Sequence, residues 1–471
     1  MKKPKSLAAA SRTAQITVRD RKGTTYQLIQ KIGRGGQGTV WRVKGGNLAA
    51  KLLPRGSNSQ RELLSQRLAF VRRLDLQGLS IAKPLETLDP PYCGYVMQFL
   101  RDMMPVSRLF SATGGQELTP AWYQGTGGVK RRLRLMASLA RLMARIHARG
   151  LIYGDLSPEN AFISESSAHN EVWLIDADNL DYQSQPSGSK RCPYTPGYGA
   201  PEVVNGTGCT TSLSDNYSFA ILCFRVLSLV HPFLGDHVND GEPELEEAAF
   251  AGGIPWIEDP EHDLNRTGHG VPRQWVLSPR VRNLFERTFG DGRTDRTKRP
   301  SAAEWADTLE VAANSTLTCP KCSGSFYFNQ RTCPYCKNPA PSFCQSYLFL
   351  WDPKEKRAIR TPQRKPKLFG HSVISNDDPY QVTKGVAYGS EAENRDEVLC
   401  AIRAVGERLE IHHPDGLPES VRLLQGDMLI RLTGKQTDVA LSERLGSLEM
   451  HFGTTEESHY FLFFGIRGVA S

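Results

Sequence analysis

The sequence predicts an α+β protein with a small, mainly β lobe, a larger helical lobe, a cysteine-rich knuckle and a β-rich C-terminal domain. The hydrophobic pattern alternates up to about residue 100, follows helical spacing to about residue 312, and alternates again after residue 346. Four cysteines lie close together between the last two stretches. A chain of 471 residues is also too long for one core, because domains usually hold roughly 100 to 200 residues.

Composition indicates a soluble globular protein of the cytoplasm. Hydrophobic residues make up 39% and charged residues 23%, and no apolar run approaches the roughly 20 residues that span a bilayer. The net charge of +8 is spread through helical patterns, so neither nucleic acid nor a membrane is expected as a partner. Residues 1–22 carry Lys2, Lys3 and Lys5 without the apolar centre of a secretory signal, which predicts a flexible basic tail.

The small lobe is expected over residues 23–100 and contains a glycine-rich segment between the strand-like stretches Tyr26 to Ile32 and Thr39 to Val43. Glycines let a hairpin backbone approach phosphate groups without side-chain clashes. The candidate nucleotide-binding residues of this segment are Gly33, Gly35, Gly36, Gly38 and Val40. Most matches of this kind are glycine-rich turns that bind no ligand. A nucleotide-binding role for this segment is therefore supported only by the motifs further along the chain.

Lys51 interrupts an apolar run, where a charge directed at a core needs a partner to offset its desolvation. Glu62 is the only acidic residue between Lys51 and Asp75, and it begins a helical pattern. We therefore expect Lys51 and Glu62 to pair and to hold the amine toward the phosphates of a nucleotide. The alternative is an exposed strand lysine and a solvated helix glutamate.

The large lobe is expected over residues 101–313, and a hinge at Gln98 to Asp102 would receive the nucleotide base through Gln98 and Leu100. Asp155 and Asn160 lie in a proline-bearing loop after a helix that Gly150 closes. An apolar strand further on ends in Asp176. One carboxylate can orient a nucleophile while an amide and a second carboxylate hold Mg²⁺, although the loop alone would also suit an ordinary turn.

The order of these motifs, with Ala200-Pro201-Glu202 after them, resembles the eukaryotic-like Ser/Thr protein kinases of bacteria over residues 24–312. The resemblance implies a two-lobed protein-kinase-like fold in which Asp155 is the catalytic base, Asn160 and Asp176 hold Mg²⁺, and Lys51 steadies ATP. It also implies that Glu202 pairs with Arg299. Asp215 would brace the catalytic loop, and a simple N-cap explains that residue equally well.

The sequence departs from the family pattern at several positions. Gly154 stands where the family has the arginine that binds a phosphorylated activation segment, so we expect activity that does not require phosphorylation there. Ser157 replaces a lysine near the γ-phosphate, which predicts slow turnover. Ala177 and Asp178 follow Asp176 where the family has phenylalanine and glycine. Asp178 is interpreted as a solvated turn carboxylate rather than a second metal ligand. A pseudokinase scaffold and a small-molecule phosphotransferase remain the alternatives.

The segment Thr195 to Glu202 is similar to the substrate-docking segment of protein kinases, and Thr195 favours serine or threonine as the acceptor. The motif variants look most like bacterial kinases encoded beside a metal-dependent phosphatase and a von Willebrand factor A-type protein, the triad linked to tellurium resistance and stress. The resemblance therefore implies protein substrates and these two partner proteins.

Residues 314–342 contain two Cys-x-x-Cys pairs formed by Cys319, Cys322, Cys333 and Cys336. Four thiolates leave no open position on a tetrahedral ion, which predicts a zinc ribbon with a structural Zn²⁺; iron or free core cysteines are the alternatives. Residues 343–471 alternate in a way typical of a β-sandwich or small barrel, expected to bind a partner or to dock on the kinase lobes.

Overall fold

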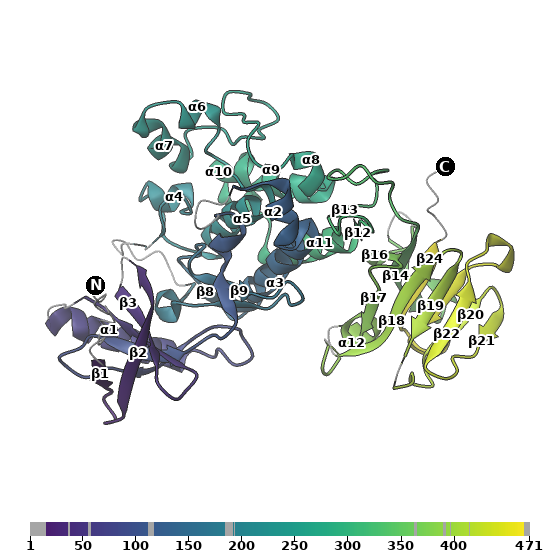
Figure 1. Ribbon diagram of the computed structural model, residues 1–471, viewed down its shortest axis with the longest axis horizontal. Helices are drawn as coiled ribbons and strands as arrows, with labels where there is room; N and C mark the ends of the chain where they lie inside the picture. Colours follow the sequence, from purple (N-terminus) through teal and green to yellow (C-terminus); the bar gives the residue numbers. More distant parts are fainter. Residues whose placement is uncertain are drawn as a thin grey trace, which may run out of the picture. The chain divides into compact units, whose positions relative to one another are not determined.

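The protein folds into two compact units in this computed structural model (Figure 1). The first unit comprises residues 1–106 and 142–219, and the second comprises residues 107–141 and 220–471. The structure describes residues 16–35, 38–54, 58–111, 117–183, 192, 194–361, 365–389, 392–395, 397–413 and 415–465. No helix within these ranges has the length and apolar character needed to cross a membrane.

The first unit opens with a six-stranded antiparallel sheet in the order β1-β2-β3-β4-β6-β5. Its strands are β1 (Ile16–Arg19), β2 (Thr25–Gly35), β3 (Gly38–Val43), β4 (Leu48–Leu52), β5 (Pro84–Thr87) and β6 (Gly94–Gln98). Strand β1 corrects the predicted tail, because residues 16–19 pair with β2 and Val18 is buried in the sheet's core. The basic residues near the start of the chain obscured this short apolar alternation.

Helix α1 (Asn58–Arg73) packs on the sheet through Leu68, which shares a small core with Ala49, Tyr95 and Met97. The helix lies close to the predicted stretch of residues 60–74. Lys51 lies two residues after Ala49 on β4 and therefore on the same face of the sheet, where it is also buried, with 3% of the residue exposed.

Short strands in the rest of the first unit position the loops that bear Asp155 and Asp176. These elements are β7 (Met103–Pro105), β8 (Leu151–Ile152), β9 (Ala161–Ser164), β10 (Val172–Leu174), η2 (Ala177–Asn179), β11 (Asp181–Tyr182) and α4 (Pro201–Val204). Strands β9 and β10 are antiparallel with Ala161 opposite Leu174, so the residues just before β9 and just after β10 lie at the same end of the pair. Strand β11 pairs with β8, which leads into the Asp155 loop.

Helices dominate the part of the second unit that precedes the cysteine pairs. They are η1 (Val106–Leu109), α2 (Pro120–Gly125), α3 (Gly128–Ala148), α5 (Ser212–Ser228), α6 (Asp236–Asn239), α7 (Pro243–Phe250), α8 (Arg273–Val276), α9 (Pro279–Phe289), α10 (Asp291–Thr294), η3 (Arg296–Lys298) and α11 (Ala302–Asn314), of which η1, α3 and α5 also extend into the first unit. Helix α3 ends where predicted, since Gly150 takes a left-handed conformation with φ of 70°. Aromatic side chains form the core, and the contacts of Phe224 with Trp256, Phe285 and Phe289 are edge-on.

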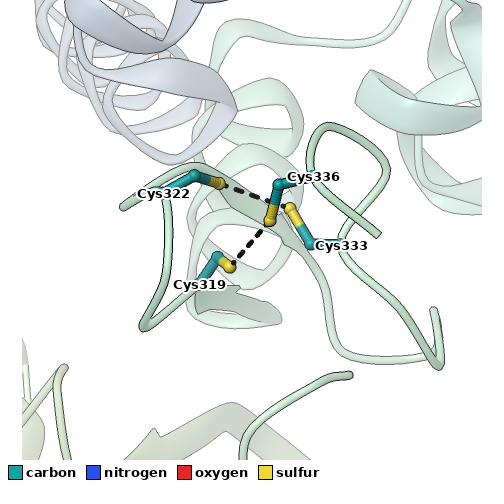
Figure 2. A group of neighbouring side chains, drawn as sticks. All are labelled: Cys319, Cys322, Cys333 and Cys336. Carbon is teal, nitrogen blue, oxygen red and sulfur yellow. Dashed lines mark hydrogen bonds between the residues drawn. The ribbon is translucent and has the colours of Figure 1, made fainter. Parts of the chain in front are cut away.

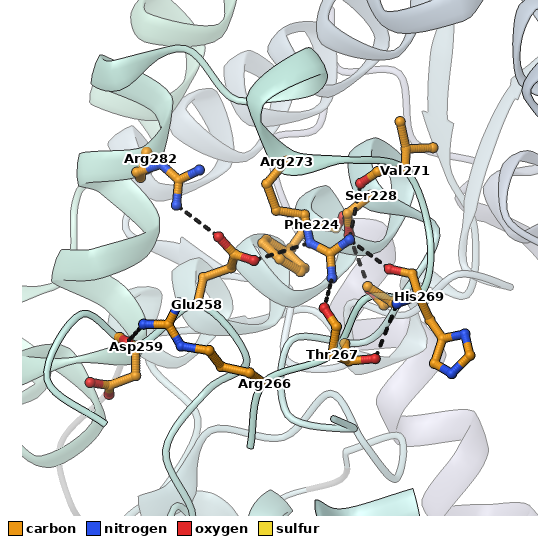
Figure 3. A network of polar contacts seen from close by, with 11 residues as sticks. Phe224, Ser228, Glu258, Asp259, Arg266, Thr267, His269, Val271, Arg273 and Arg282 are labelled. Carbon is orange, nitrogen blue, oxygen red and sulfur yellow. Dashed lines mark hydrogen bonds and ion pairs between the residues drawn. The ribbon is translucent and has the colours of Figure 1, made fainter. Parts of the chain in front are cut away.

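A buried arginine links α8 to the loop before it (Figure 3). Arg273 is 6% exposed, its Nε lies 3.4 Å from Glu258 Oε1, and its Nη1 donates to the His269 and Val271 carbonyls. Arg282 of α9 lies 2.9 Å from the other oxygen of Glu258. Glu258 therefore compensates a charge that would be costly to bury alone.

Two short strands, β12 (Thr316–Thr318) and β13 (Ser325–Tyr327), precede a β-rich domain with two sheets. Its elements are β14 (Phe343–Asp352), β15 (Arg357–Ala358), β16 (Leu368–Ser375), β17 (Tyr380–Thr383), α12 (Lys384–Tyr388), β18 (Val398–Val405), β19 (Arg408–His412), β20 (Arg422–Gln425), β21 (Met428–Ile430), β22 (Gln436–Ala440), η5 (Glu443–Leu445), β23 (Leu448–His451) and β24 (Tyr460–Gly465). One sheet holds β14, β15, β16, β20, β21, β23 and β24, and the other has the order β17-β18-β19-β22. Ile402 and Leu462, from different sheets, share one core, so the domain is a sandwich rather than a barrel.

Candidate active site

The loop that bears Asp155 is fixed by a buried carboxylate on α5. Asp215 is 2% exposed and accepts hydrogen bonds from the backbone N–H groups of Tyr153 at 2.8 Å and Gly154 at 2.9 Å. Its Oδ2 also lies 3.1 Å from Nε2 of His147, on α3. The predicted brace is therefore present. The N-cap explanation is wrong, because α5 already begins at Ser212.

Asp155 and Asn160 are held in one compact turn. The side-chain amide of Asn160 donates to the Asp155 carbonyl at 3.0 Å, and this bond assigns its Oδ1 as the atom left to accept a metal ion. The Asn160 carbonyl accepts from Ile175 N at 2.9 Å, which places Asn160 beside the residue that precedes Asp176. The hydroxyl of Thr195 donates to Asp155 Oδ1 at 2.7 Å. Asp155 is thus oriented by an alcohol of the same chemical type as a serine or threonine acceptor.

Lys51 and Asp176 form an ion pair, with Nζ 2.7 Å from Oδ2. Burial raises the pKa of Asp176 above its usual 3.8, Lys51 opposes that shift, and the neighbouring Asp178 and Asp155 add to it. Several carboxylates close together are unfavourable without a cation. With the amide oxygen of Asn160, they offer the hard oxygen donors that Mg²⁺ prefers, so the residues present fit the predicted ion.

The expected pairing of Lys51 with Glu62 is not the arrangement that the structure shows. Lys51 lies on the carboxylate of Asp176, whereas Glu62 is exposed in the first turns of α1 and accepts a hydrogen bond from Gln66 at 3.2 Å. Desolvation favours the nearest buried carboxylate as the partner of a buried ammonium group. The predicted role of Glu62 in holding Lys51 toward a nucleotide stays a prediction.

The glycine-rich segment forms the hairpin between β2 and β3. Gly33 lies opposite Val40 and Gly35 opposite Gly38, while Gly36 falls outside the described residues. Gly38 has a φ of 152°, and a Cβ atom there would lie 2.5 Å from the Leu52 carbonyl oxygen, so the position requires glycine. Val40 also lies opposite Lys51 in the β3–β4 pair, which brings the hairpin beside the predicted phosphate-binding lysine.

The predicted hinge follows the last residue of β6. Gln98 ends that strand opposite Leu48, and its side chain is exposed. Leu100 is half-buried just beyond the strand. Both residues therefore lie next to the sheet that carries Lys51, and their contact with a nucleotide base stays a prediction.

Two departures from the family pattern have a structural explanation. Gly154 is left-handed with a φ of 85°, and a Cβ atom there would lie 3.3 Å from the carbonyl oxygen of Asn179, so the backbone does not suit the family's arginine. Asp178 lies in the η2 turn, as expected, but it is half-buried and lies 3.4 Å from the hydroxyl of Tyr95, so it is not fully solvated. One contact near Asp178 was not predicted from the sequence. Arg67 of α1 donates from its Nε to the Asp178 carbonyl at 2.7 Å.

The four predicted cysteines converge on one point (Figure 2). All four sulfur atoms lie within 4.8 Å of one another, with Cys319 and Cys336 3.5 Å apart and Cys322 and Cys333 3.6 Å apart. A tetrahedral Zn²⁺ with sulfur atoms at about 2.3 Å separates its ligands by about 3.8 Å. The cluster therefore has the size of a Cys₄ zinc site.

The pKa values of the cluster differ according to local environment. The backbone N–H of Asn338 lowers the pKa of Cys336 to about 7, whereas burial raises the pKa of Cys322 to about 12. Metal binding requires thiolates, so an incoming cation must displace protons from the cysteines with raised pKa values, Cys322 and Cys333.

The chain belongs to the protein kinase domain family, because the family model described as "Protein kinase domain" matches residues 26–308. The matched segment contains the glycine hairpin, Lys51 and the loops of Asp155 and Asp176. It ends before the cysteine pairs and the β-sandwich.

Bacterial Ser/Thr kinases are among the similar proteins. The chain is 29% identical over 303 residues to serine/threonine-protein kinase pkn2 of Myxococcus xanthus, a match that covers 62% of this chain and 33% of that protein. It is 28% identical over 227 residues to serine/threonine-protein kinase PkaB of Streptomyces coelicolor, covering 46% of this chain and 51% of that protein. The chain thus spans about a third to a half of the length of these two relatives.

Proposed function

We propose that this protein transfers the γ-phosphate of Mg²⁺·ATP to serine or threonine hydroxyl groups of proteins. The observation that carries the proposal is the convergence of Lys51, Asp155, Asn160 and Asp176 within one unit of the fold. Asp155 would accept the hydroxyl proton, while Lys51 would bind phosphate oxygens once Mg²⁺ occupies the carboxylate that it now contacts. Bound Mg²⁺ supplies neutralisation of the triphosphate charge. Similarity to bacterial Ser/Thr kinases supports the same reaction.

Transfer of labelled phosphate from ATP tests the proposal against its two alternatives. We expect labelled protein with the wild type and a loss of about 10²- to 10⁴-fold with Asp155→Ala, because that substitution removes the general base. Glu159→Ala is a matched control, since Glu159 is exposed in the same loop. Absence of transfer with retained folding would favour a pseudokinase scaffold, and label found only on small molecules would favour a small-molecule phosphotransferase.

We also propose that the four cysteines bind one structural Zn²⁺, so that the stretch around them is a zinc ribbon. The sulfur separations and the closed set of four ligands support this assignment. Elemental analysis of the purified protein should give one zinc per chain, and Cys322→Ser together with Cys333→Ser should abolish it. Iron in place of zinc would revise the metal and leave the ligand set in place.

The proposed substrates are proteins, and the first candidates are a metal-dependent phosphatase and a von Willebrand factor A-type protein. The motif variants Gly154 and Ser157 support this placement through their resemblance to the triad kinases. Phosphosite mapping by mass spectrometry after incubation with each purified candidate tests it, with the Asp155→Ala protein as the control. If the wild-type and the Asp155→Ala kinase gave equal phosphorylation, the sites would be due to a contaminating kinase.

A further inference from the structure

Helix α1 is tied to the residues after Asp176 by the side chain of Arg67. Its Nε donates to the Asp178 carbonyl at 2.7 Å and its Nη2 donates to the Leu180 carbonyl. Its Nη1 lies 3.5 Å from Oδ2 of Asp181. One guanidinium therefore contacts three of the five residues that follow Asp176.

Two of these three contacts are to backbone carbonyls, and the third is to the side chain of Asp181. The turn of η2 closes through Leu180 N, which donates to the Ala177 carbonyl at 3.1 Å, and Arg67 binds the carbonyls of Asp178 and Leu180 on either side of Asn179. A planar guanidinium presents its N–H groups at fixed angles, so binding two carbonyls sets the orientation of both peptides.

The turn that Arg67 holds begins with a strained residue. Asp176 has a φ of 54°, a left-handed conformation that costs a non-glycine residue about 1 kcal/mol or more. Such a conformation persists only when surrounding contacts hold it. The aromatic pair of Phe70 and Tyr182, edge-on with ring centres 5.8 Å apart, attaches the same helix to strand β11.

We infer that Arg67 is a positioning residue that holds the metal-binding carboxylate of Asp176 in place and couples it to helix α1. Lys51 contacts Asp176 from the sheet, whereas Glu62 is exposed. Helix α1 thus contacts the segment after Asp176 through Arg67, which lies just over one turn beyond Glu62, and through Phe70. The part of this inference that concerns phosphate transfer rests on the proposed function, and the part that concerns metal binding does not.

The experiment compares Arg67→Met, Arg67→Lys and a control, Arg72→Met. Arg72 lies on the same helix and contacts Glu86 at 3.1 Å, so its loss removes an arginine without touching the segment after Asp176. Binding of a non-hydrolysable ATP analogue is measured against Mg²⁺ concentration. The electron paramagnetic resonance spectrum of Mn²⁺ in the same complex reports the ligand geometry directly.

For Arg67→Met we expect the Mg²⁺ concentration at half-maximal binding to rise about 10- to 100-fold, the usual effect of removing a group that orients a metal ligand. Analogue binding without Mg²⁺ should be unchanged, and the Mn²⁺ spectrum should broaden. Arg67→Lys keeps the charge and can reach one carbonyl, so its effect should be smaller. Arg72→Met should match the wild type.

A Mg²⁺ dependence in Arg67→Met equal to that of the wild type, or an equal shift in Arg72→Met, would overturn the inference. If Arg67→Met does not fold, Arg67→Lys decides the question, because an unaltered Mg²⁺ dependence in a folded lysine variant contradicts the role of the guanidinium fork. If the wild type binds Mg²⁺ and the analogue but transfers no phosphate, the proposed function fails while the Arg67 comparison still gives an answer. Where transfer occurs, Arg67→Met should lower kcat and leave KM for the protein substrate unchanged.

Discussion

Substitution of Asp215 by asparagine should destabilise the protein and disable the Asp155 loop together. The carboxylate accepts two backbone N–H bonds, from Tyr153 and Gly154, in a position that is 2% exposed. An asparagine has one accepting oxygen, so its NH₂ group must face one of these donors. Asp215→Asn therefore keeps the shape of the side chain and replaces an acceptor by a donor.

The size of the destabilisation follows from the hydrogen bonds that Asp215→Asn removes or weakens. A hydrogen bond to a charged group contributes about 1.5 to 3 kcal/mol, and a neutral one about 1 kcal/mol. One backbone N–H loses its acceptor completely and the other exchanges a charged acceptor for a neutral one. We expect a decrease of about 2 to 5 kcal/mol in the free energy of unfolding. Displacement of the loop by about 1 Å would also lower kcat about 100-fold.

Chemical unfolding followed by circular dichroism, together with phosphate-transfer kinetics, measures both effects. Asp307→Asn is the matched control, because Asp307 is exposed on α11 and its substitution should change stability by less than about 0.5 kcal/mol. An Asp215→Asn protein that unfolds like the wild type would refute the reasoning. So would a destabilised protein with an unaltered kcat, since the brace would then not determine the position of the catalytic loop.

Three further outcomes are expected. Mg²⁺-dependent nucleotide binding should weaken as the pH falls through the raised pKa of Asp176, because the protonated carboxyl must lose its proton to bind the cation. Binding titrations from pH 8 to about pH 4 measure this change, and Asp176→Asn should bind weakly at every pH. Zinc removal by a tight chelator should lower Tm in the wild type and have little effect on Cys322→Ser, which calorimetry would show. Glu258→Ala should cost about 1 to 3 kcal/mol because it leaves Arg273 buried without its carboxylate, whereas Arg282→Ala should cost less than about 1 kcal/mol in the same unfolding assay.

Local signals explain why much of the fold could be predicted. Helix α3 and its end at Gly150 follow from periodicity and a glycine stop, both of which depend on neighbouring residues alone. The spacing of the two Cys-x-x-Cys pairs likewise predicted that the four sulfur atoms lie close together. Strand β1 could not be recognised, because four residues give too short an alternation and its burial depends on pairing with β2.

The contacts of the candidate site depend on residues that are distant in sequence. Arg67 meets Asp178 across 111 positions, and α1 carries other arginines that look the same in sequence, such as Arg72 and Arg73. The choice of Lys51 between Glu62 and Asp176 depends on which carboxylate is buried beside it, a property of the folded chain. Sequence reasoning could therefore supply the participants of the site but only part of their pairing.

The cysteine-rich segment, residues 314–342, makes direct contacts with the helical lobe and is not an independent module. Ser325 Oγ accepts a hydrogen bond from Lys130 N at 3.0 Å in the first turn of α3, where backbone N–H groups have no partner within the helix. The hydroxyl of Tyr327 donates to the Val276 carbonyl at 3.0 Å. The same segment also shares a hydrophobic core with Val373 of the sandwich. A domain boundary between residues 313 and 314 thus separates residues that pack together, and loss of the proposed Zn²⁺ should uncap α3 as well as unfold residues 314–342.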